Sequence, residues 1–394
     1  MSSSPGEGAT SALLGTSRWH VRDRQYSARQ KLGVFLLDLP RYLWALRPTR
    51  RAGRECRPWI LVRNRREHLV RSGGGDGVAC AWQWTSELHA PLVFPALGQL
   101  LLSAALRDCP IRLPSPGMAR AFAERPDVTF LIGHRGRDRL PHLAWTLRSI
   151  AAQIDVSFEC IVVEQDSGQT VRDHLPGWVR YVHTPPPYEG MPYSRAWAFN
   201  VGAREARSPL LVLHDNDMLV PETYAAELVR KHRLGHEIIN LKRLIFYLSE
   251  EHTCELFEGN ASLARRPPES IMQNAEAGGS VAVDRDAYFA LGGMDEAFVG
   301  WGGEDNEFWE RALTRRVWPF GYLPVIHLWH QSQPGKRAVD GRGATTAELS
   351  DRRAGIPIDK RIEELRSRDF GNPWRLDPTP LLEAGFRLVT NRVE

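Results

Sequence analysis

The feature that most constrains the fold is an alternation of apolar runs with helical segments between residues 128 and 217. Apolar residues recur at helical spacing over 140–151 and 194–206, and Asp138 is a candidate cap for the first helix. Strand–helix–strand units pair their strands in parallel through right-handed crossovers, so the sequence predicts an α/β fold with a mainly parallel central sheet. The three runs that read as buried strands are VTFLIG at 128–133, FECIVVEQDS at 158–167 and PLLVLHDND at 209–217, and the last two end in polar residues.

Polar residues follow these runs, at the edge where a parallel sheet gathers its ligands. The third run ends in HDND, which places Asp215 and Asp217 one residue apart. Two carboxylates there would offer oxygen ligands to Mg²⁺ or Mn²⁺ beside a diphosphate. A simple turn is the alternative, because aspartate is frequent in turns after strands.

A second candidate for metal binding is HLWH, which follows the apolar segment GYLPVI and contains His327 and His330. Imidazole favours Mn²⁺ over Mg²⁺, so a mixed Asp and His site is Mn-like. Residues i and i+3 of an extended strand face opposite sides, so both histidines reach one ion only if the chain bends. We therefore expect one ligand from this motif, with a structural histidine as the alternative.

The segment GWGGEDNEFWERA, residues 300–312, sets three glycines around a tryptophan and follows them with adjacent acids. Glycine permits positive φ and close backbone approach, which suggests a chain shaped around a polar ligand. Acids in the first turn of a helix also complement the helix dipole, so an ordinary turn and helix start is the alternative.

Composition limits the class of protein. With 394 residues, 42% of them hydrophobic, the chain can form one large or two ordinary globular domains. Five widely spaced cysteines without a CxxC pair argue against a disulfide framework or a zinc ribbon and fit a reducing compartment. The first twenty residues lack the pattern of a secretory signal, so we expect a cytoplasmic protein.

The N-terminal third is rich in arginine, with clusters at 50–57 and 63–66. Such a region could contact anionic lipid or nucleic acid, although a solvated basic face is the commoner explanation. Its apolar segment 32–46 is too short and too interrupted to span a bilayer. Either this segment lies on a membrane surface or it packs against the main domain as a helix.

The proline- and glycine-containing segment LPSPG at 113–117 marks a domain boundary. We expect four regions: a flexible arm at 1–30, a basic N-terminal region of unknown role at 31–117, a catalytic domain at 125–335 and a C-terminal tail at 336–394.

Five motifs in order, spanning about half of the chain, resemble the catalytic domain of the β-1,4-galactosyltransferase family. A more distant resemblance is to chondroitin-polymerase-like and polypeptide N-acetylgalactosaminyltransferase enzymes. WGGED is the most specific of the matching pieces. The motifs are HRGR at 134–137, YSRAWAFNVG at 193–202, HDND at 214–217, GGSVAVDRDAYFALGGMDEAFVGWGGEDNEF at 278–308 and HLWH at 327–330.

The resemblance implies a GT-A nucleotide-sugar-binding fold preceded by an N-terminal extension, a UDP-sugar donor, and inversion at the anomeric carbon. It implies that Asp217 and His330 bind Mn²⁺ or Mg²⁺, and that Asp305 is the catalytic base while Glu304 holds sugar hydroxyls. His327 occupies a position where animal members often have methionine. The residues implied to bind donor or acceptor are Arg135, Arg137, Asp166, Tyr193, Arg195, Asp215, Trp301, Gly302 and Gly303.

The sequence therefore favours a metal-dependent glycosyltransferase acting on a glycan or glycolipid acceptor, peripheral to the inner membrane through its basic region, and without a nucleic-acid partner. One alternative is a sugar-nucleotide pyrophosphorylase, disfavoured because HRGR is too short for a nucleotidyl-transfer loop. The other is a non-catalytic domain that binds sugar or UDP and docks on a membrane or polyanion.

Overall fold

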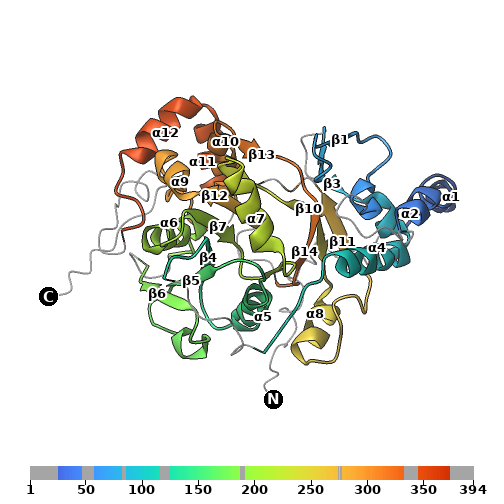
Figure 1. The fold of residues 1–394 in the computed structure, drawn as a ribbon, viewed down its shortest axis with the longest axis horizontal. Coiled ribbons are helices and arrows are strands. Elements are labelled where there is room, and N and C mark those ends of the chain that lie inside the picture. Colours follow the sequence, from blue (N-terminus) through green and yellow to red (C-terminus); the bar gives the residue numbers. More distant parts are fainter. Residues whose placement is uncertain are drawn as a thin grey trace, which may run out of the picture.

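The computed structural model describes residues 25–46, 57–81, 86–115, 124–186, 191–273, 275, 277–300, 302–331 and 345–372. Two sheets dominate it, and helices cover their faces (Figure 1). The larger sheet has the order β13 (Val317–Trp318), β9 (Ile238–Ile239), β12 (Ser280–Asp284), β7 (Leu210–His214), β4 (Val128–His134), β5 (Phe158–Gln165) and β6 (Arg180–Thr184). The smaller has the order β3 (Ser86–Glu87), β11 (Ser270–Gln273), β10 (Lys242–Tyr247), β14 (Leu323–His327) and β8 (Met218–Leu219).

The centre of the larger sheet is parallel, as the sequence predicts. Strand β4 lies between β5 and β7 and is parallel to both, and β6 continues the parallel run beyond β5. Strand β12 is antiparallel to β7 and β9, so the sheet is mixed at that end. The predicted α/β class and the three predicted strands are thereby confirmed.

Each face of this sheet packs against a predicted helix. Helix α6 (Arg195–Glu205) shares a buried cluster with Leu131 and Val163, whereas α5 (Leu140–Ala151) shares another with Phe130 and Val162. Because side chains alternate across a strand, burial on both faces makes the strands predominantly apolar.

The two helices start differently. The Ser194 hydroxyl caps α6 by accepting the Trp197 N–H at 3.3 Å. The expectation that Asp138 caps α5 is wrong, since the residue before that helix is Arg139 and no side chain caps it. Pro141 in the first turn removes one of the N–H groups that a cap would satisfy.

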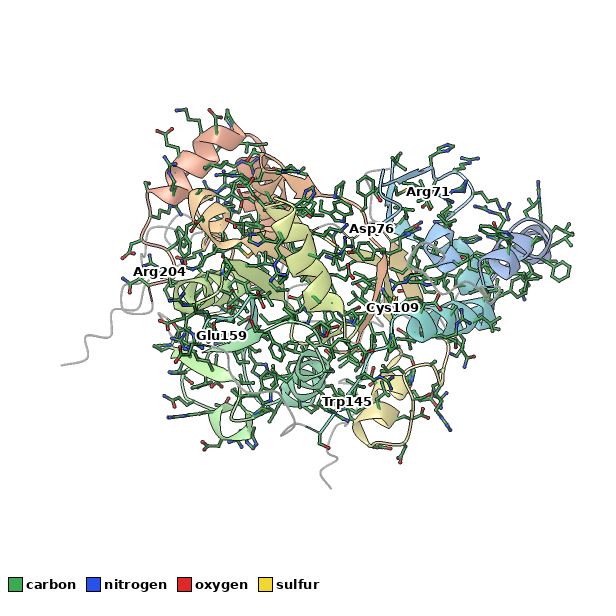
Figure 2. All side chains as sticks on the ribbon, in the orientation of Figure 1. Arg71, Asp76, Cys109, Trp145, Glu159 and Arg204 are labelled. Atoms are coloured by element: carbon green, nitrogen blue, oxygen red, sulfur yellow. The ribbon has the colours of Figure 1, made fainter. Side chains whose placement is uncertain are left out.

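Residues 57–81 and 86–115 pack against the smaller sheet. Strand β3 pairs with β11, and α4 (Pro95–Asp108) buries Leu101 and Leu102 in the same cluster as Phe246 and Val325. The hairpin of β1 (Leu69–Arg71) and β2 (Val78–Cys80) is tied to α7 (Tyr224–Arg233) through Asp76, which accepts hydrogen bonds from Arg230 and Lys231 at 2.7 and 2.9 Å. Asp76 is labelled in Figure 2. The N-terminal region is therefore joined to the rest of the molecule by strand pairing, apolar packing and ion pairs.

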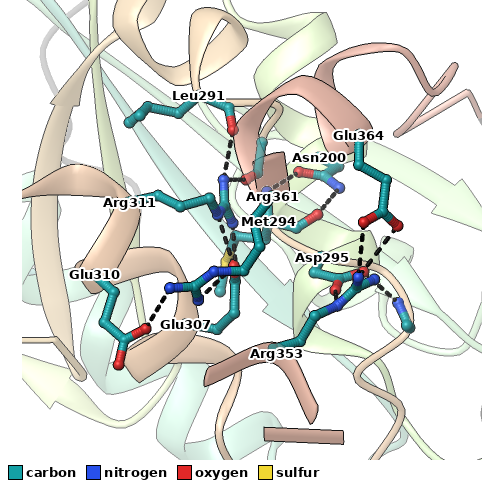
Figure 3. Close-up of polar contacts among 12 residues, drawn as sticks. Asn200, Leu291, Met294, Asp295, Glu307, Glu310, Arg311, Arg353, Arg361 and Glu364 are labelled. Carbon is teal, nitrogen blue, oxygen red and sulfur yellow. Dashed lines mark hydrogen bonds and ion pairs between the residues drawn. The ribbon is translucent and has the colours of Figure 1, made fainter. Parts of the chain in front are cut away.

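Four helices gather at the opposite end of the molecule from α4 (Figure 1). Ion pairs link three of them, with Arg311 and Arg361 converging on Glu307 and Arg353 lying between Asp295 and Glu364 (Figure 3). Two of these helices lie within the region expected to be a tail. They are α9 (Arg285–Ala290), α10 (Glu304–Ala312), α11 (Thr345–Ala354) and α12 (Ile358–Arg366).

Short helices complete the described structure: α1 (Ala28–Leu37), α2 (Leu39–Ala45), η2 (Pro58–Leu61), α3 (His89–Val93), η4 (Arg172–His174) and α8 (Glu250–Phe257). Within the described ranges, no helix combines the length and the apolar character needed to cross a bilayer.

Candidate active site

Asp217, His327 and His330 form a cluster with the chemistry of a metal site. Asp217 precedes β8, which pairs antiparallel with β14 and sets Met218 opposite His327. The Asp217 carboxylate oxygens lie 3.7 Å from His327 Nε2 and 3.4 Å from His330 Nε2, and one ligand atom from each residue falls within 4.8 Å of the others. The chain bends after β14, where the Leu328 N–H donates to the Asp217 carbonyl at 2.9 Å. The bend brings both histidines to Asp217, where the sequence led us to expect one.

The donor set of this cluster fits a divalent transition metal. Asp217 Oδ1 is buried and accepts no hydrogen bond within the described structure. Burial opposes ionisation of Asp217, but the charges of His327, Arg139 and His330 outweigh it and hold the pKa below the usual range. One ionised carboxylate and two imidazoles form the kind of mixed site that suits Mn²⁺ better than Mg²⁺.

Arg139 is part of this cluster, and the sequence analysis missed it. Its Nη2 donates a short hydrogen bond to Asp217 Oδ2 and a second, of 3.2 Å, to Asn216 Oδ1. Asn216 Nδ2 in turn contacts His134 Nδ1 at 2.9 Å, and the other ring nitrogen of His134 contacts the Gly136 carbonyl at 2.8 Å. Burial lowers the pKa of His134 to about 4, so a neutral ring accepts from Asn216 and donates to Gly136. The signal in the sequence was the arginine two residues beyond HRGR.

Tyr247 is a second residue that the sequence analysis missed. It lies at the end of β10, directly opposite His327 in the parallel pairing with β14. Its ring stacks on the His327 imidazole, with centroids 4.5 Å apart and planes 27° from parallel. The stack fixes the orientation of one potential metal ligand. An aromatic residue ending an apolar run was the only sequence signal for it.

Arg195 joins two of the predicted acids. Its Nε donates to Asp215 Oδ1 at 2.6 Å, and its Nη1 donates a short hydrogen bond to Asp305 Oδ1. The three side chains come from the start of α6, the end of β7 and the start of α10. The structure therefore brings together residues that lie 110 positions apart in the chain.

The neighbouring acids have perturbed ionisation. Burial and the negative charges of Asp217 and Asp305 raise the pKa of Asp215 to about 6, although Arg195 opposes the shift. Burial and the charge of Asp305 raise the pKa of Glu304 to about 7. Such shifts are common where charges are gathered for chemistry.

The glycine segment before α10 is shaped as the sequence suggested. Gly300, Gly302 and Gly303 have φ values of 94°, 108° and 90°, which other residues rarely adopt. The Gly300 N–H donates to the Tyr193 carbonyl at 3.0 Å, and the Gly302 N–H donates to Glu304 Oε2 at 3.0 Å. These contacts hold the segment beside α6. Trp301 lies outside the described residues.

Other predicted donor-binding residues lie along the carboxyl edge of the larger sheet. Arg135 and Arg137 follow β4, where Arg137 is exposed and Arg135 Nη1 donates to the Met191 carbonyl at 2.6 Å. Asp166 follows β5, and its carbonyl contacts His183 Nε2 at 2.8 Å. Their placement near the acids follows from the parallel pairing of β5, β4 and β7.

Residues 267–319 match a protein family described as the N-terminal domain of galactosyltransferase. The matched range contains Glu304 and Asp305, together with Gly278, whose position permits close approach of the Asp305 carboxylate. A Cβ added at Gly278 would lie 3.1 Å from Asp305 Oδ2.

Curated proteins similar to this chain are also glycosyltransferases by name. A chondroitin synthase of Escherichia coli is 42% identical over 67 residues, which are 17% of this chain and 10% of that protein. Human β-1,4-galactosyltransferase 4 is 26% identical over 50% of this chain and 46% of its own length. A validoxylamine A glucosyltransferase of Streptomyces hygroscopicus subsp. limoneus is 27% identical over 49% of each chain. The chain thus spans about half or less of these relatives.

Among solved structures, the catalytic domain of Drosophila β1,4-galactosyltransferase 7 in complex with xylobiose aligns with 60% of this chain and 84% of that one. The sequence identity is 16% and the TM-score is 0.35, so this likeness supports no inference about the site. The family match and the curated relatives confirm the resemblance predicted from the motifs.

Proposed function

We propose, from its resemblance to galactosyltransferase-type enzymes, that this protein is an inverting, metal-dependent glycosyltransferase. It would move a hexose or N-acetylhexosamine, with a galactose-type sugar as the first candidate, from a UDP-sugar to a hydroxyl of a glycan or glycolipid. The observation that carries the proposal is the meeting of two groups of residues. The cluster of Asp217, His327 and His330 lies beside the Arg195 bridge between Asp215 and Asp305, because Asp215 and Asp217 stand two residues apart between β7 and β8.

One side of this site is suited to the departing diphosphate. A divalent cation held by Asp217, His327 and His330 would supply positive charge next to the donor phosphates. Arg139 contacts the same carboxylate, and a guanidinium is a good bidentate partner for phosphate oxygens. Arginine and histidine side chains would therefore orient the UDP group before transfer.

The other side is suited to the acceptor hydroxyl. In a single inverting displacement the hydroxyl attacks the anomeric carbon opposite UDP, so a base must lie across from the phosphates. Asp305 lies in the first turn of α10 and accepts a short hydrogen bond from Arg195. Arg195 is a positioning residue that aims this carboxylate. Glu304, with a pKa of about 7, could both donate to and accept from sugar hydroxyls.

Asp305→Asn tests the base. We expect the transfer rate to fall by about 10²- to 10⁴-fold while UDP affinity is unchanged, because the amide retains the shape but cannot take the proton. UDP release measures the first quantity, and calorimetric titration with UDP and Mn²⁺ measures the second. Asp286→Asn, the same change in the exposed first turn of α9, is the control. Equal loss of transfer and UDP binding would indicate a structural role for Asp305.

Asp217→Asn tests the cation site without any need for activity. Replacing the only carboxylate of the described cluster should weaken Mn²⁺ binding at least about tenfold in the absence of nucleotide, because a neutral amide is a poor ligand. Electron paramagnetic resonance of unbound Mn²⁺ during a titration measures this affinity, with Asp286→Asn again as the control. Unchanged Mn²⁺ affinity would remove the metal assignment.

The released product separates the proposal from its alternatives. A glycosyltransferase releases UDP, a pyrophosphorylase releases or consumes pyrophosphate, and a binding domain releases neither. Incubating the protein with Mn²⁺, a panel of UDP-sugars and a mixed glycan pool would distinguish the three and identify the donor. We further propose a cytoplasmic location.

A further inference from the structure

An apolar surface on α1 and α2 gathers most of the exposed large hydrophobic side chains in the described part of the chain. Six of the ten lie on these two helices, and each is more than half exposed. Large apolar patches on soluble proteins usually mark a site of protein or membrane interaction. We call this surface the apolar face; it consists of Leu32, Phe35, Leu36, Leu37, Leu43 and Trp44.

The two helices that carry the apolar face are firmly anchored. Val34, Tyr42 and Ala45 point the other way and belong to the main hydrophobic cluster. Arg65 clamps Asp38 at the corner between the helices, with Nε 2.9 Å from Oδ1 and Nη2 2.6 Å from Oδ2. The apolar face is therefore held in a fixed position at the edge of the molecule, where α1 and α2 project on the right of Figure 1.

A cavity of about 560 Å³ borders the apolar face and shares Trp44 with it. Its lining includes Arg41, Arg63, His68 and Arg71, and Figure 2 shows Arg71 on the same lobe of the molecule. We call this cavity the basic groove. Guanidinium groups beside an indole suit a phosphate that approaches from an apolar–aqueous boundary.

The charge around the apolar face indicates what covers it. Residues 25–46 and 57–81 contain eight Lys and Arg but three Asp and Glu, a formal charge of +5, which exceeds the +4 of the whole chain. A protein interface would leave these arginines to be paired by acids of the partner. An anionic bilayer instead offers acyl chains to the face and phosphates to the groove in a single surface.

We propose that the apolar face and the basic groove dock the protein on an anionic phospholipid bilayer. Helices α1 and α2 lie in the headgroup layer with Phe35 and Leu36 inserted, and Arg63 and Arg71 contact lipid phosphates. This inference concerns how the protein is held at a membrane, and it does not depend on which sugar is transferred.

Flotation of the full chain with vesicles tests this proposal. The wild type should float with vesicles of phosphatidylcholine mixed with phosphatidylglycerol, float less with phosphatidylcholine alone, and be released by salt. The double variant Phe35→Glu with Leu36→Glu should lower vesicle affinity at least about tenfold, because it removes the two apolar side chains that insert into the bilayer. The matched control is Leu234→Glu with Leu313→Glu, which changes side chains of similar exposure on other surfaces and should bind as the wild type does.

A second variant separates the two parts of the surface. Arg63→Gln with Arg71→Gln should abolish the preference for phosphatidylglycerol while leaving the weaker binding to phosphatidylcholine. The midpoint temperature of thermal unfolding and the Mn²⁺ affinity should be unchanged in every variant, which would show that the fold is intact. The proposal is overturned if the wild type floats with neither vesicle, or if Phe35→Glu with Leu36→Glu floats as the wild type does. It is also overturned if that variant only converts a dimer to a monomer, since a second copy would then cover the face.

Discussion

At the scale of single residues, Arg139 determines the charge that an incoming cation meets. Its guanidinium pairs with Asp217, so cation and guanidinium compete for the same carboxylate. We expect Arg139→Gln to tighten Mn²⁺ binding without nucleotide by roughly fivefold, the equivalent of about 1 kcal/mol for a partly exposed pair. Titration with Mn²⁺ measures the change, and Arg137→Gln, at an exposed position nearby, should have no effect. Weaker binding in Arg139→Gln would mean that the arginine supports the site.

Gly133 allows Tyr193 to pack against β4. A Cβ at this position would lie 2.0 Å from the Tyr193 hydroxyl and 2.9 Å from Ala198 Cβ. Gly133→Ala should therefore lower the free energy of unfolding by about 1–3 kcal/mol and displace Tyr193. Gly168→Ala, where a Cβ meets nothing within 4 Å, should leave stability nearly unchanged in the same denaturant titration. Equal stability of both variants would show that the backbone shifts without cost.

Which site residues could be predicted depends on how local their signal is. Asp215, Asp217 and His330 stand in motifs directly after apolar strands, so their place at a sheet edge follows from the nearby sequence. Arg139 and Tyr247 reach the site only because α5 packs beside β8 and β10 pairs with β14. Their positions arise from long-range contacts, which no local pattern encodes.

At the scale of elements, the strands that could be predicted are those buried on both faces. Strands β4, β5 and β7 are five to eight residues long and predominantly apolar. Strands β3, β8, β9 and β13 have two residues each, too few for any periodicity to appear. These four short strands were therefore not predicted. The pairing of the smaller sheet and the helices within 345–372 were not predicted either.

Helix α10, which carries Asp305, is fixed by buried charges. Arg311 is fully buried and pairs with Glu307 at 2.6 Å, and Arg361 contacts the same carboxylate (Figure 3). Glu307→Ala leaves these arginines short of negative charge and should lower the free energy of unfolding by about 3–5 kcal/mol. Glu310→Ala, which removes a half-exposed partner of Arg361, should cost less than about 1 kcal/mol. Urea titration compares them, and similar losses would contradict the role given to Glu307.

At the scale of the whole molecule, buried acids make stability depend on pH. Burial raises the pKa of Glu296 to about 7, although Asn200 and the Gly371 N–H hydrogen-bond its carboxyl group. A raised carboxyl pKa means that the folded state binds the proton more tightly than the unfolded chain does. The stabilisation is complete below the ordinary value of 4.5 and is lost as pH rises through about 7.

Glu296→Gln should therefore flatten the dependence of stability on pH between 5 and 8. The amide keeps the hydrogen-bonding shape without titrating, and the wild type should lose up to about 3 kcal/mol more than the variant over this range. Part of the slope should remain, since the pKa of Glu304 is also raised to about 7. Unfolding by urea at several pH values measures the slope, and parallel curves for the two proteins would assign it elsewhere.

Asp217 lies between β7 of the larger sheet and β8 of the smaller one, and the pairing of β8 with β14 places it next to the two histidines. An ion bound there would crosslink the larger sheet to the smaller one. Removing the ion with a chelator should then make the two sheets more mobile relative to each other. A distant substitution that shifts one sheet relative to the other would lower the affinity for the ion without changing any ligand.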